Sequence, residues 1–586
     1  MPAIICILFP PLLLVTVRHK LQKQSLEWNI ELLVEYLIST LILNLVVMTI
    51  TYLVGGNSQS FADTLNNSIG FTVRYMVLAS GLALLEPGII GMVNFKFEYK
   101  SFSLNMHSIA IILFYFSTLA FGLIGFMRCF DNAFWGDEGY TIQLAKMSLK
   151  DMINATAGDV HPPLYYFLVK GLYCLFGNSG FTYHLSAWIP YCAILLLACS
   201  VIRKEFGVIT AGIVVVFDSL ISEAITHNAE ARMYALAAFF VLAAYVELYY
   251  ILKSGKIIHW VLFAVCSLGA AYTHYYALVT VAFFYLTLVI MMLFQHKLIK
   301  PTVITSIITI VGYLPWLAIL ISTFKRTAEG WWSTDIPEFK NTLQSAFDSS
   351  WLLYTFFVIV LIYTLYQLKV LSFKYDKQKW KDKKDVFQIR VSLGKRLSVS
   401  RELSWILSGV MAFVGTAIVG IGISRIVRPL FLIRYIYPAS LIAYMVMGYC
   451  LSRLNFRRLY AVLLCVAILW MNVPALLSTC RSERELNRET TKFMQSVRPE
   501  EDARICTNVL DINWTLADYY YPGIAHSYYD TLAAIEADDR EIWLIWRDKL
   551  SEDSLMELSQ KGLNAEEVYE GRFPNTIYCY VYRVVR

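Results

Sequence analysis

Two polar motifs hold the side chains best suited to chemistry. In DNAFWGDEGYT the adjacent carboxylates of Asp137 and Glu138 stand among aromatic residues and glycines, and in GDVHPPLYY, Asp159 and His161 precede two prolines. A carboxylate can accept the proton of a hydroxyl group, which is a poor nucleophile near neutral pH without such a base. An Asp-Glu pair is also common in solvated loops, and His-Pro-Pro can form a rigid turn between two helices.

Arginines in two other segments are suited to binding an anion. SRIVRPLFLIRYIYPAS contains Arg425, Arg428 and Arg434, and HNAEARMY contains Arg232 with Glu230 nearby. A guanidinium group can donate two hydrogen bonds to one phosphate. Arg434 is the first charge at the start of an apolar run, where an unpaired guanidinium is costly and commonly lines a polar cavity. Each of these arginines can instead be an interfacial residue whose head group reaches water.

Histidines and tryptophans on the same predicted face are further candidates. His274, in AYTHYY, is retained as a contact for phosphate or pyrophosphate, and His227 lies on the same face. A lone histidine among aromatic residues is more often packed and hydrogen-bonded than catalytic. Trp331 and Trp332 could stack on a sugar, but an interfacial tryptophan belt explains them more simply.

The carboxylates and the histidine of the first two motifs also supply oxygen and nitrogen ligands for a metal ion. Their spacing does not require a metal site, so a divalent metal ion is left open as a cofactor. Eleven cysteines are scattered along the chain, without a CxxC pair or a Cys/His cluster. Neither a zinc site nor a disulfide framework is therefore expected.

The composition is typical of a membrane protein. Of 586 residues, 57% are hydrophobic and 16% are charged, against about 45–50% and about 25% in soluble domains. Apolar runs of about 20 residues recur, each long enough to cross a bilayer as a helix. The net charge of +6 does not indicate nucleic-acid binding, because the basic residues lie mainly in short loops between the apolar runs.

Loop charge orients these runs, because lysine and arginine concentrate in cytoplasmic loops. On this rule the chain makes about 14 crossings, and the polar motifs and arginine segments lie outside. Residues 128–182 then form one external loop, with a short interfacial helix at 162–177. Two apolar hairpins, 205–252 and 257–296, have HNAEARMY and THYY at their external turns.

Three regions follow from this pattern. Residues 1–100 form an N-terminal membrane extension, residues 101–479 form the transmembrane core, and residues 480–586 have ordinary polarity. The last region alternates strand-like runs, such as EIWLIW and TIYCYVYRVV, with the helix-like EDSLMELSQKG. We therefore expect an α-helical polytopic membrane protein with a small C-terminal α/β domain on the extracytoplasmic side. The three N-terminal spans are expected near 4–17, 30–54 and 71–94.

The segment WGDEGYT, followed by DVHPPLYYFLVKGLYCLFG, resembles the GT-C glycosyltransferases. It is most similar to bacterial relatives of the protein O-mannosyltransferases and of the aminoarabinose transferases that act on lipid A. The resemblance covers roughly residues 105–480 and is specific only in the first external loop. Residues 1–100 depart from the usual core, and the C-terminal domain resembles no named module.

The resemblance implies roles for particular residues. The family's catalytic carboxylate follows the first core span, so that role carries over to Asp137, with Glu138 as its neighbour. The EARMYA-like and RY-containing stretches of the family favour Arg232 and Arg434 as contacts of the donor phosphate. The resemblance also implies inversion at the anomeric carbon, and some members of the family use a divalent ion.

Together these observations predict a glycosyltransferase in the plasma membrane that takes a sugar from a polyprenyl-phosphate carrier. The acceptor, a lipid, protein or glycan of the cell envelope, is expected on the extracytoplasmic side. A single carboxylate base is sufficient, because a phosphate lipid is already a good leaving group. One alternative is a transporter or flippase of a lipid-linked saccharide. Proteins of that class tend to contain inverted repeats and broken helices. Another is an envelope polysaccharide polymerase or ligase.

Overall fold

The computed structural model describes most of the chain beyond residue 105. The described residues are 97–99, 102–104, 106–296, 298–329, 335–368, 371–375, 387–391, 400–454, 458–509, 519–536, 540–572 and 578–585. The chain divides into two compact units. The first comprises Met1–Phe114, Ile362–Ser398 and Leu459–Trp470, and the second comprises Tyr115–Leu361, Val399–Arg458 and Met471–Arg586. All candidate site residues belong to the second unit.

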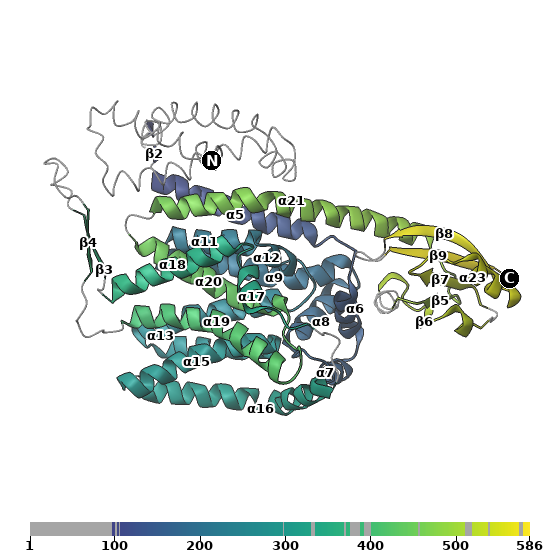
Figure 1. Cartoon of the computed structure of the whole chain (residues 1–586), viewed down its shortest axis with the longest axis horizontal. Coiled ribbons are helices and arrows are strands. Elements are labelled where there is room, and N and C mark those ends of the chain that lie inside the picture. Colours follow the sequence, from purple (N-terminus) through teal and green to yellow (C-terminus); the bar gives the residue numbers. More distant parts are fainter. Residues whose placement is uncertain are drawn as a thin grey trace, which may run out of the picture. The chain divides into compact units, whose positions relative to one another are not determined.

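Helices dominate the described part of the chain (Figure 1). Before the first hairpin turn they are α5 (Met106–Arg128), α6 (Gly136–Lys146), α7 (Leu149–Ala157), α8 (Leu164–Phe176), α9 (Gly180–Leu197), α10 (Arg203–Phe206), α11 (Val208–Leu220) and α12 (Ser222–His227). The following helices are α13 (Tyr234–Ser254), α14 (Ile257–Thr273), α15 (Tyr275–Gln295), α16 (Ile299–Glu329), α17 (Phe339–Ser345), α18 (Ser350–Gln367), α19 (Arg401–Ile426), α20 (Tyr437–Arg453) and α21 (Arg458–Ser496).

The predicted class, a helical polytopic membrane protein, is confirmed. Within the described residues, eight helices are long and apolar enough to cross a membrane, and three shorter apolar helices accompany them. The two predicted hairpins correspond to α11–α13 and to α14–α15. The count of about 14 crossings stays a prediction, since the three N-terminal spans lie outside the described residues, as do Trp331 and Trp332.

The predicted interfacial helix is α8, and its sequence explains both of its ends. Pro163 occupies the N-cap, so the two prolines of the HPP motif end the preceding turn and start the helix. Gly177 ends it with a φ of 75°, a conformation that costs glycine little. At 13 residues, α8 is shorter than the roughly 20 residues of a membrane span. Its position at the membrane surface remains a prediction.

The core of the second unit is tightly packed around α20. Every residue of this helix from Tyr437 to Leu451 is buried inside the protein. On the neighbouring helices α13 and α19, Tyr245 and Trp405 stack with ring centroids 4.6 Å apart, and each donates a hydrogen bond to the backbone oxygen of the other. The hydroxyl group of Tyr245 and the indole N–H of Trp405 are therefore both hydrogen-bonded within the apolar interior.

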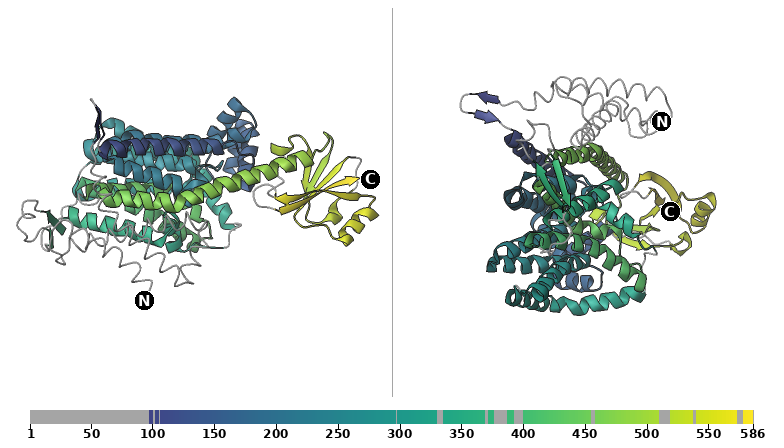
Figure 2. Two further views of the ribbon diagram at one scale, coloured as in Figure 1. Left: turned by 90° about the horizontal axis from the view of Figure 1, so that it is seen from above. Right: turned by 60° about the vertical axis from the view of Figure 1, so that its left-hand side comes forward.

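The C-terminal region is a small α/β domain, as predicted. Its five-stranded sheet has the order β6-β5-β7-β9-β8, with α23 (Glu552–Gln560) beside it. The strands are β5 (Arg504–Thr507), β6 (Ala525–Tyr528), β7 (Ile542–Trp546), β8 (Asn564–Arg572) and β9 (Tyr578–Val585). Pairing is parallel among β5, β6 and β7 and antiparallel for β8 and β9. The C-terminal part of α21 leads into this sheet (Figure 2, left).

Strand β7 shows why this region folds as a sheet. Its sequence IWLIW is buried along its whole length. Trp543 and Ile545 join one apolar cluster, while Ile542, Leu544 and Trp546 join the other, as the two-residue period of a strand requires. Two further hairpins belong to the first unit and pair β1 (Phe97–Tyr99) with β2 (Phe102–Leu104) and β3 (Leu371–Tyr375) with β4 (Phe387–Val391).

Two polar connections tie the sheet domain and α21 to the helical core. The guanidinium of Arg128, at the end of α5, donates to both carboxylate oxygens of Glu483 on α21, at 2.9 and 2.5 Å. The hydroxyl groups of Tyr519 and Tyr520 donate to the side chain and backbone of Asn132. The segment that precedes α6 is therefore hydrogen-bonded to α21 through Arg128 and to the sheet domain through Asn132.

Replacing Gly448 tests the close packing of α20 on α11. A Cβ atom at this position would lie 2.9 Å from the Cα of Thr210, so the helix backbones would have to separate. We expect Gly448→Ala to lower the unfolding free energy by about 1–3 kcal/mol, seen as a lower Tm in detergent. Gly422→Ala is the matched control, because its Cβ would meet nothing within 4 Å. An unchanged Tm for Gly448→Ala would contradict this account of the packing.

Candidate functional site

Asp137 lies at the centre of a cluster of charges drawn from three separate segments. It stands in the first turn of α6, and its Oδ2 is 3.2 Å from Nη2 of Arg434 and 3.7 Å from Nη2 of Arg232. Arg232 also donates from Nη1 to the backbone oxygen of Asp137, at 2.9 Å. Arg232 is buried, whereas the carboxylate of Asp137 is one-third exposed. The carboxylate is thus accessible while both cations are held against it.

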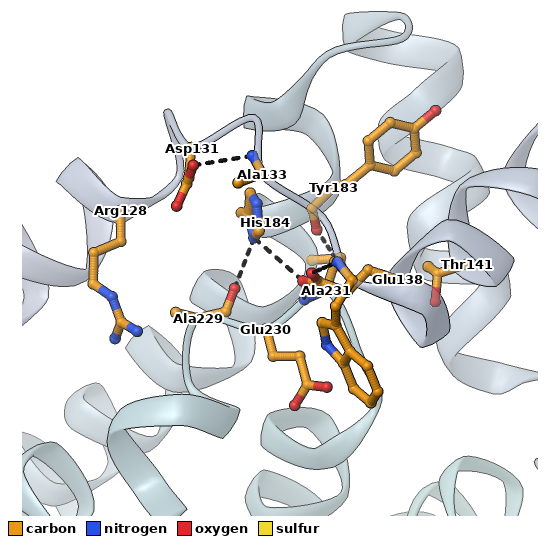
Figure 3. A network of polar contacts seen from close by, with 12 residues as sticks. Arg128, Asp131, Ala133, Glu138, Thr141, Tyr183, His184, Ala229, Glu230 and Ala231 are labelled. Carbon is orange, nitrogen blue, oxygen red and sulfur yellow. Dashed lines mark hydrogen bonds and ion pairs between the residues drawn. The ribbon is translucent and has the colours of Figure 1, made fainter. Parts of the chain in front are cut away.

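Glu138 fixes the position of this cluster rather than facing the arginines. Its Oε2 accepts a hydrogen bond from the backbone N–H of Trp135, and its Oε1 accepts one from the N–H of Ala231, at 2.7 Å (Figure 3). The first bond closes the N-terminal turn of α6, and the second attaches that turn to the residue before Arg232. Burial raises the pKa of Glu138, and the nearby carboxylate of Glu230 adds to this effect.

Arg434 lies among aromatic rings, and one of its N–H donors has no hydrogen-bond partner among the described residues. Its guanidinium carbon is 5.5 Å from the ring centroid of Trp135, 6.0 Å from that of Tyr234 and 5.9 Å from that of Tyr435. Nε of Arg434 and Nε of Arg232 are both buried without a hydrogen-bond partner among the described residues. Both guanidinium groups therefore keep a donor that can bind a further hydrogen-bond acceptor.

The predicted contacts Asp159, His161 and His274 surround the same cluster. His161 Nδ1 is 3.2 Å from Asp159 Oδ2, and the rings of His161 and His274 are 5.8 Å apart. Burial lowers the pKa of both histidines, and the positive charge of Arg232 lowers them further. Burial alone would raise the pKa of Asp159, but the hydrogen bond from His161 lowers it. Neutral histidines therefore stand beside the two cations.

The remaining predicted residues contribute less to this site. Arg428 and Arg425 are exposed, and among the described residues neither forms an ion pair with Asp137. Over the same part of the chain, no group of three or more His, Cys, Asp or Glu side chains is arranged to hold a metal ion. The carboxylates and histidine considered as metal ligands instead bind arginines, backbone amides and each other.

A cavity lined in part by Arg434 contains residues that the sequence analysis did not combine. It has a volume of about 510 Å³ and is lined by Trp135, Ser222, Glu223, Thr226, His227, Glu230 and Arg434. His227 lies between two carboxylates, with Nδ1 2.9 Å from Glu230 and Nε2 3.1 Å from Glu223. Burial would lower the pKa of His227, but the two carboxylates raise it overall. The spacing of Glu223, His227 and Glu230, four and three residues apart, was the available signal.

The fold is similar to that of solved structures, whereas the sequence comparisons found no match. No protein-family model matches this chain, and no curated protein matches it either. The apo structure of ArnT from Cupriavidus metallidurans is similar, with a TM-score of 0.51 and 12% identity over 81% of this chain and 97% of ArnT. The same protein bound to undecaprenyl phosphate gives a TM-score of 0.50 and 13% identity over the same shares. The predicted GT-C fold is thereby confirmed.

His227 gives the cavity a stability that depends on pH. Its folded-state pKa is raised, so its stabilising contribution is complete below the unfolded pKa of about 6.5 and is lost as pH rises through the higher folded value. We therefore expect His227→Gln to lower the Tm more at pH 6 than at pH 9. His526→Gln is the control, because that ring contacts a backbone oxygen of the sheet domain. An equal loss of Tm at both pH values would show that the two carboxylates do not hold a proton on His227.

Proposed function

We propose that this protein is a glycosyltransferase that moves a sugar from a polyprenyl-phosphate carrier to a hydroxyl group on the outer face of the plasma membrane. The observation that carries the proposal is the carboxylate of Asp137, 3.2 and 3.7 Å from two guanidinium groups. The similarity in fold to ArnT, which has been solved with undecaprenyl phosphate bound, supports a lipid-phosphate donor. The topology predicted from loop charge supports the outer face.

Arg434 and Arg232 are proposed to hold the donor phosphate. Both have an Nε donor with no partner among the described residues, and Arg434 also lines the cavity of about 510 Å³. As the bond to the sugar breaks, negative charge grows on the phosphate, and fixed donors in a partly buried site stabilise that charge most strongly. A bound phosphate would share the guanidinium groups with Asp137. The carboxylate would then interact less strongly with them and become a better base.

Asp137 is proposed to act as the base. The acceptor oxygen attacks the anomeric carbon of the sugar while its proton passes to the carboxylate of Asp137. The bond between that carbon and the phosphate oxygen breaks, and its electron pair leaves with the polyprenyl phosphate. A single displacement of this kind inverts the configuration of the anomeric carbon.

The other residues of the cluster are proposed to position these groups. Glu138 bonds to two backbone amides, so it holds Asp137 and Arg232 in register rather than reacting. His161 and His274 are buried and have lowered pKa values. Nδ1 of His274 accepts a hydrogen bond from the N–H of Tyr276, so in the neutral ring Nε2–H can donate to the sugar or the phosphate without adding positive charge. Nδ1–H of His161 already donates to Asp159, so its Nε2 can accept from a sugar hydroxyl.

Asp137→Asn tests the base. The amide is similar in size but cannot accept the proton, so we expect sugar transfer to fall about 10²- to 10⁴-fold while the donor still binds. The measurement is transfer of radiolabelled sugar from a panel of undecaprenyl-phosphate sugars by the purified protein. Asp151→Asn, at an exposed carboxylate of the same predicted loop, is the control and should keep full activity. Near-normal transfer by Asp137→Asn would refute the assignment.

Arg434→Ala tests the phosphate site. Losing a charge-assisted contact of about 1.5–3 kcal/mol should weaken binding of undecaprenyl phosphate about 10- to 100-fold, measured by thermophoresis in detergent. Arg425→Ala removes an exposed arginine outside the cluster and should leave the affinity unchanged. If the affinity of Arg434→Ala equals that of the unmodified protein, Arg434 does not hold the phosphate.

A further inference from the structure

A second cavity lies next to the first and shares part of its wall. Its volume is about 390 Å³, and Trp135, Thr226 and Glu230 line both cavities. The other walls come from the end of α5, the segment before α6, the start of α9, the turn after α12 and one face of α21. The first cavity contains the guanidinium of Arg434 and the imidazole of His227 beside the carboxylates of Glu223 and Glu230, and neither Arg434 nor His227 lines the second cavity. Among the residues that line the second cavity and not the first, the mechanism proposed above uses only Glu138.

The second cavity carries an excess of negative charge. Its wall contains the carboxyl groups of Asp131, Glu138, Glu230 and Glu483, against the single guanidinium of Arg128. Both carboxylate oxygens of Glu483 already bind that guanidinium. Burial raises the pKa of Asp131 to about 6, so this group is mainly ionised at pH 7.5. Even with Glu138 protonated, the cavity repels anions such as phosphate and favours neutral or cationic groups.

Two buried atoms in this wall have no hydrogen-bond partner among the described residues. They are Oε1 of Glu230 and Nε2 of His184, from side chains that are both more than nine-tenths buried (Figure 3). His184 Nδ1 is 2.9 Å from the backbone oxygen of Ala229, so this nitrogen carries the hydrogen. In the neutral ring Nε2 is then an acceptor. Glu230 Oε1 and His184 Nε2 are therefore acceptors without a donor, and a ligand that donates hydrogen bonds would satisfy both.

The rest of the wall suits a saccharide. Ser478, Thr479 and Ser482 present hydroxyl groups from α21, and Trp135 supplies an aromatic surface at the boundary between the two cavities. A buried hydrogen-bond acceptor without a donor is destabilising, and a hydroxyl-rich ligand would supply the missing donors. Sites for small polar molecules commonly combine one aromatic face with a few fixed polar groups.

We infer that the second cavity binds the acceptor and selects a hydroxyl-rich group that carries no phosphate, such as a neutral saccharide. This inference rests on the proposed function. The acceptor hydroxyl enters from the acidic side and loses its proton to Asp137 as its oxygen bonds to the anomeric carbon. The polyprenyl phosphate leaves on the arginine side, in the first cavity. The two cavities thus separate the acceptor from the anionic leaving group by charge.

Thiol labelling tests the charge of the cavity without any sugar substrate. In a chain carrying Cys174→Ser and Cys480→Ser, Thr479→Cys places a thiol in the cavity wall. Ser496→Cys places one on the same helix at an exposed position outside the cavity, as the matched control. The probes are the cationic 2-aminoethyl and the anionic 2-sulfonatoethyl methanethiosulfonates, applied at pH 7.5 and low salt, with the rate of the parent chain subtracted.

For each variant we compare the labelling rate of the cationic reagent with that of the anionic reagent. We expect this ratio to be at least about tenfold higher for Thr479→Cys than for Ser496→Cys, which corresponds to about 1.4 kcal/mol. Adding Glu230→Gln should lower the ratio at position 479 and leave the ratio at 496 unchanged. Equal ratios at the two positions, or a preference for the anion at 479, would overturn the inference. An unchanged ratio in the Glu230→Gln chain would count against it as well.

Probe binding tests the acceptor class directly. Saturation-transfer NMR on the full chain, in nanodiscs of phosphatidylcholine, uses methyl α-glucoside as the neutral probe and glucose 6-phosphate as the anionic one. We expect methyl glucoside to give a signal that Thr479→Trp removes, since the indole fills the cavity. A glucose 6-phosphate signal that is equally strong and equally sensitive to Thr479→Trp would overturn the inference. Neither measurement uses the lipid donor, so failure here is distinct from failure of the phosphate site, which Arg434→Ala reports separately.

Discussion

The site depends on one electrostatic arrangement, the carboxylate of Asp137 placed between the guanidinium groups of Arg434 and Arg232. A buried cation is stable only beside an anion or a full set of acceptors. Arg232 has almost no contact with solvent, so Asp137 supplies part of the charge balance that keeps it in place. A bound phosphate would provide the same balance, and for this reason one pair of arginines can serve both a resting carboxylate and an anionic substrate.

This arrangement brings together segments that are far apart in the sequence, and buried polar contacts hold them there. Glu138 joins the first turn of α6 to the segment containing Arg232 through two backbone amides. Trp135, Tyr234 and Tyr435 surround Arg434 and limit the positions that its guanidinium can occupy. The hydrogen bonds from Tyr519 and Tyr520 to Asn132 connect the sheet domain to the segment that precedes α6.

The two cavities differ in their balance of charge. Arg434 and His227 line one cavity beside Glu223 and Glu230, whereas an excess of carboxyl groups lines its neighbour, with Trp135, Thr226 and Glu230 shared between them. The proposed displacement would benefit from this difference, because the leaving group becomes more negative while the nucleophile loses a proton. The fold is shared with ArnT at only 12% identity. The packing of apolar helices can thus persist while most of the sequence changes.

Much of the fold and part of the site follow from the sequence alone. Apolar run length and loop charge predict the helical membrane core and its hairpins, since burying a helix in lipid requires about 20 apolar residues. Short apolar runs such as IWLIW predict the strands of the C-terminal sheet. The arginines of HNAEARMY and of LFLIRYIY were predicted as anion contacts because they are charges at the ends of apolar runs. Only the tertiary structure decided that both meet Asp137, that Glu138 bonds to backbone amides, and that His184 leaves a buried acceptor open. The physical reason is that periodicity and composition report which face of an element is buried, whereas distances between side chains on different helices depend on how those helices pack.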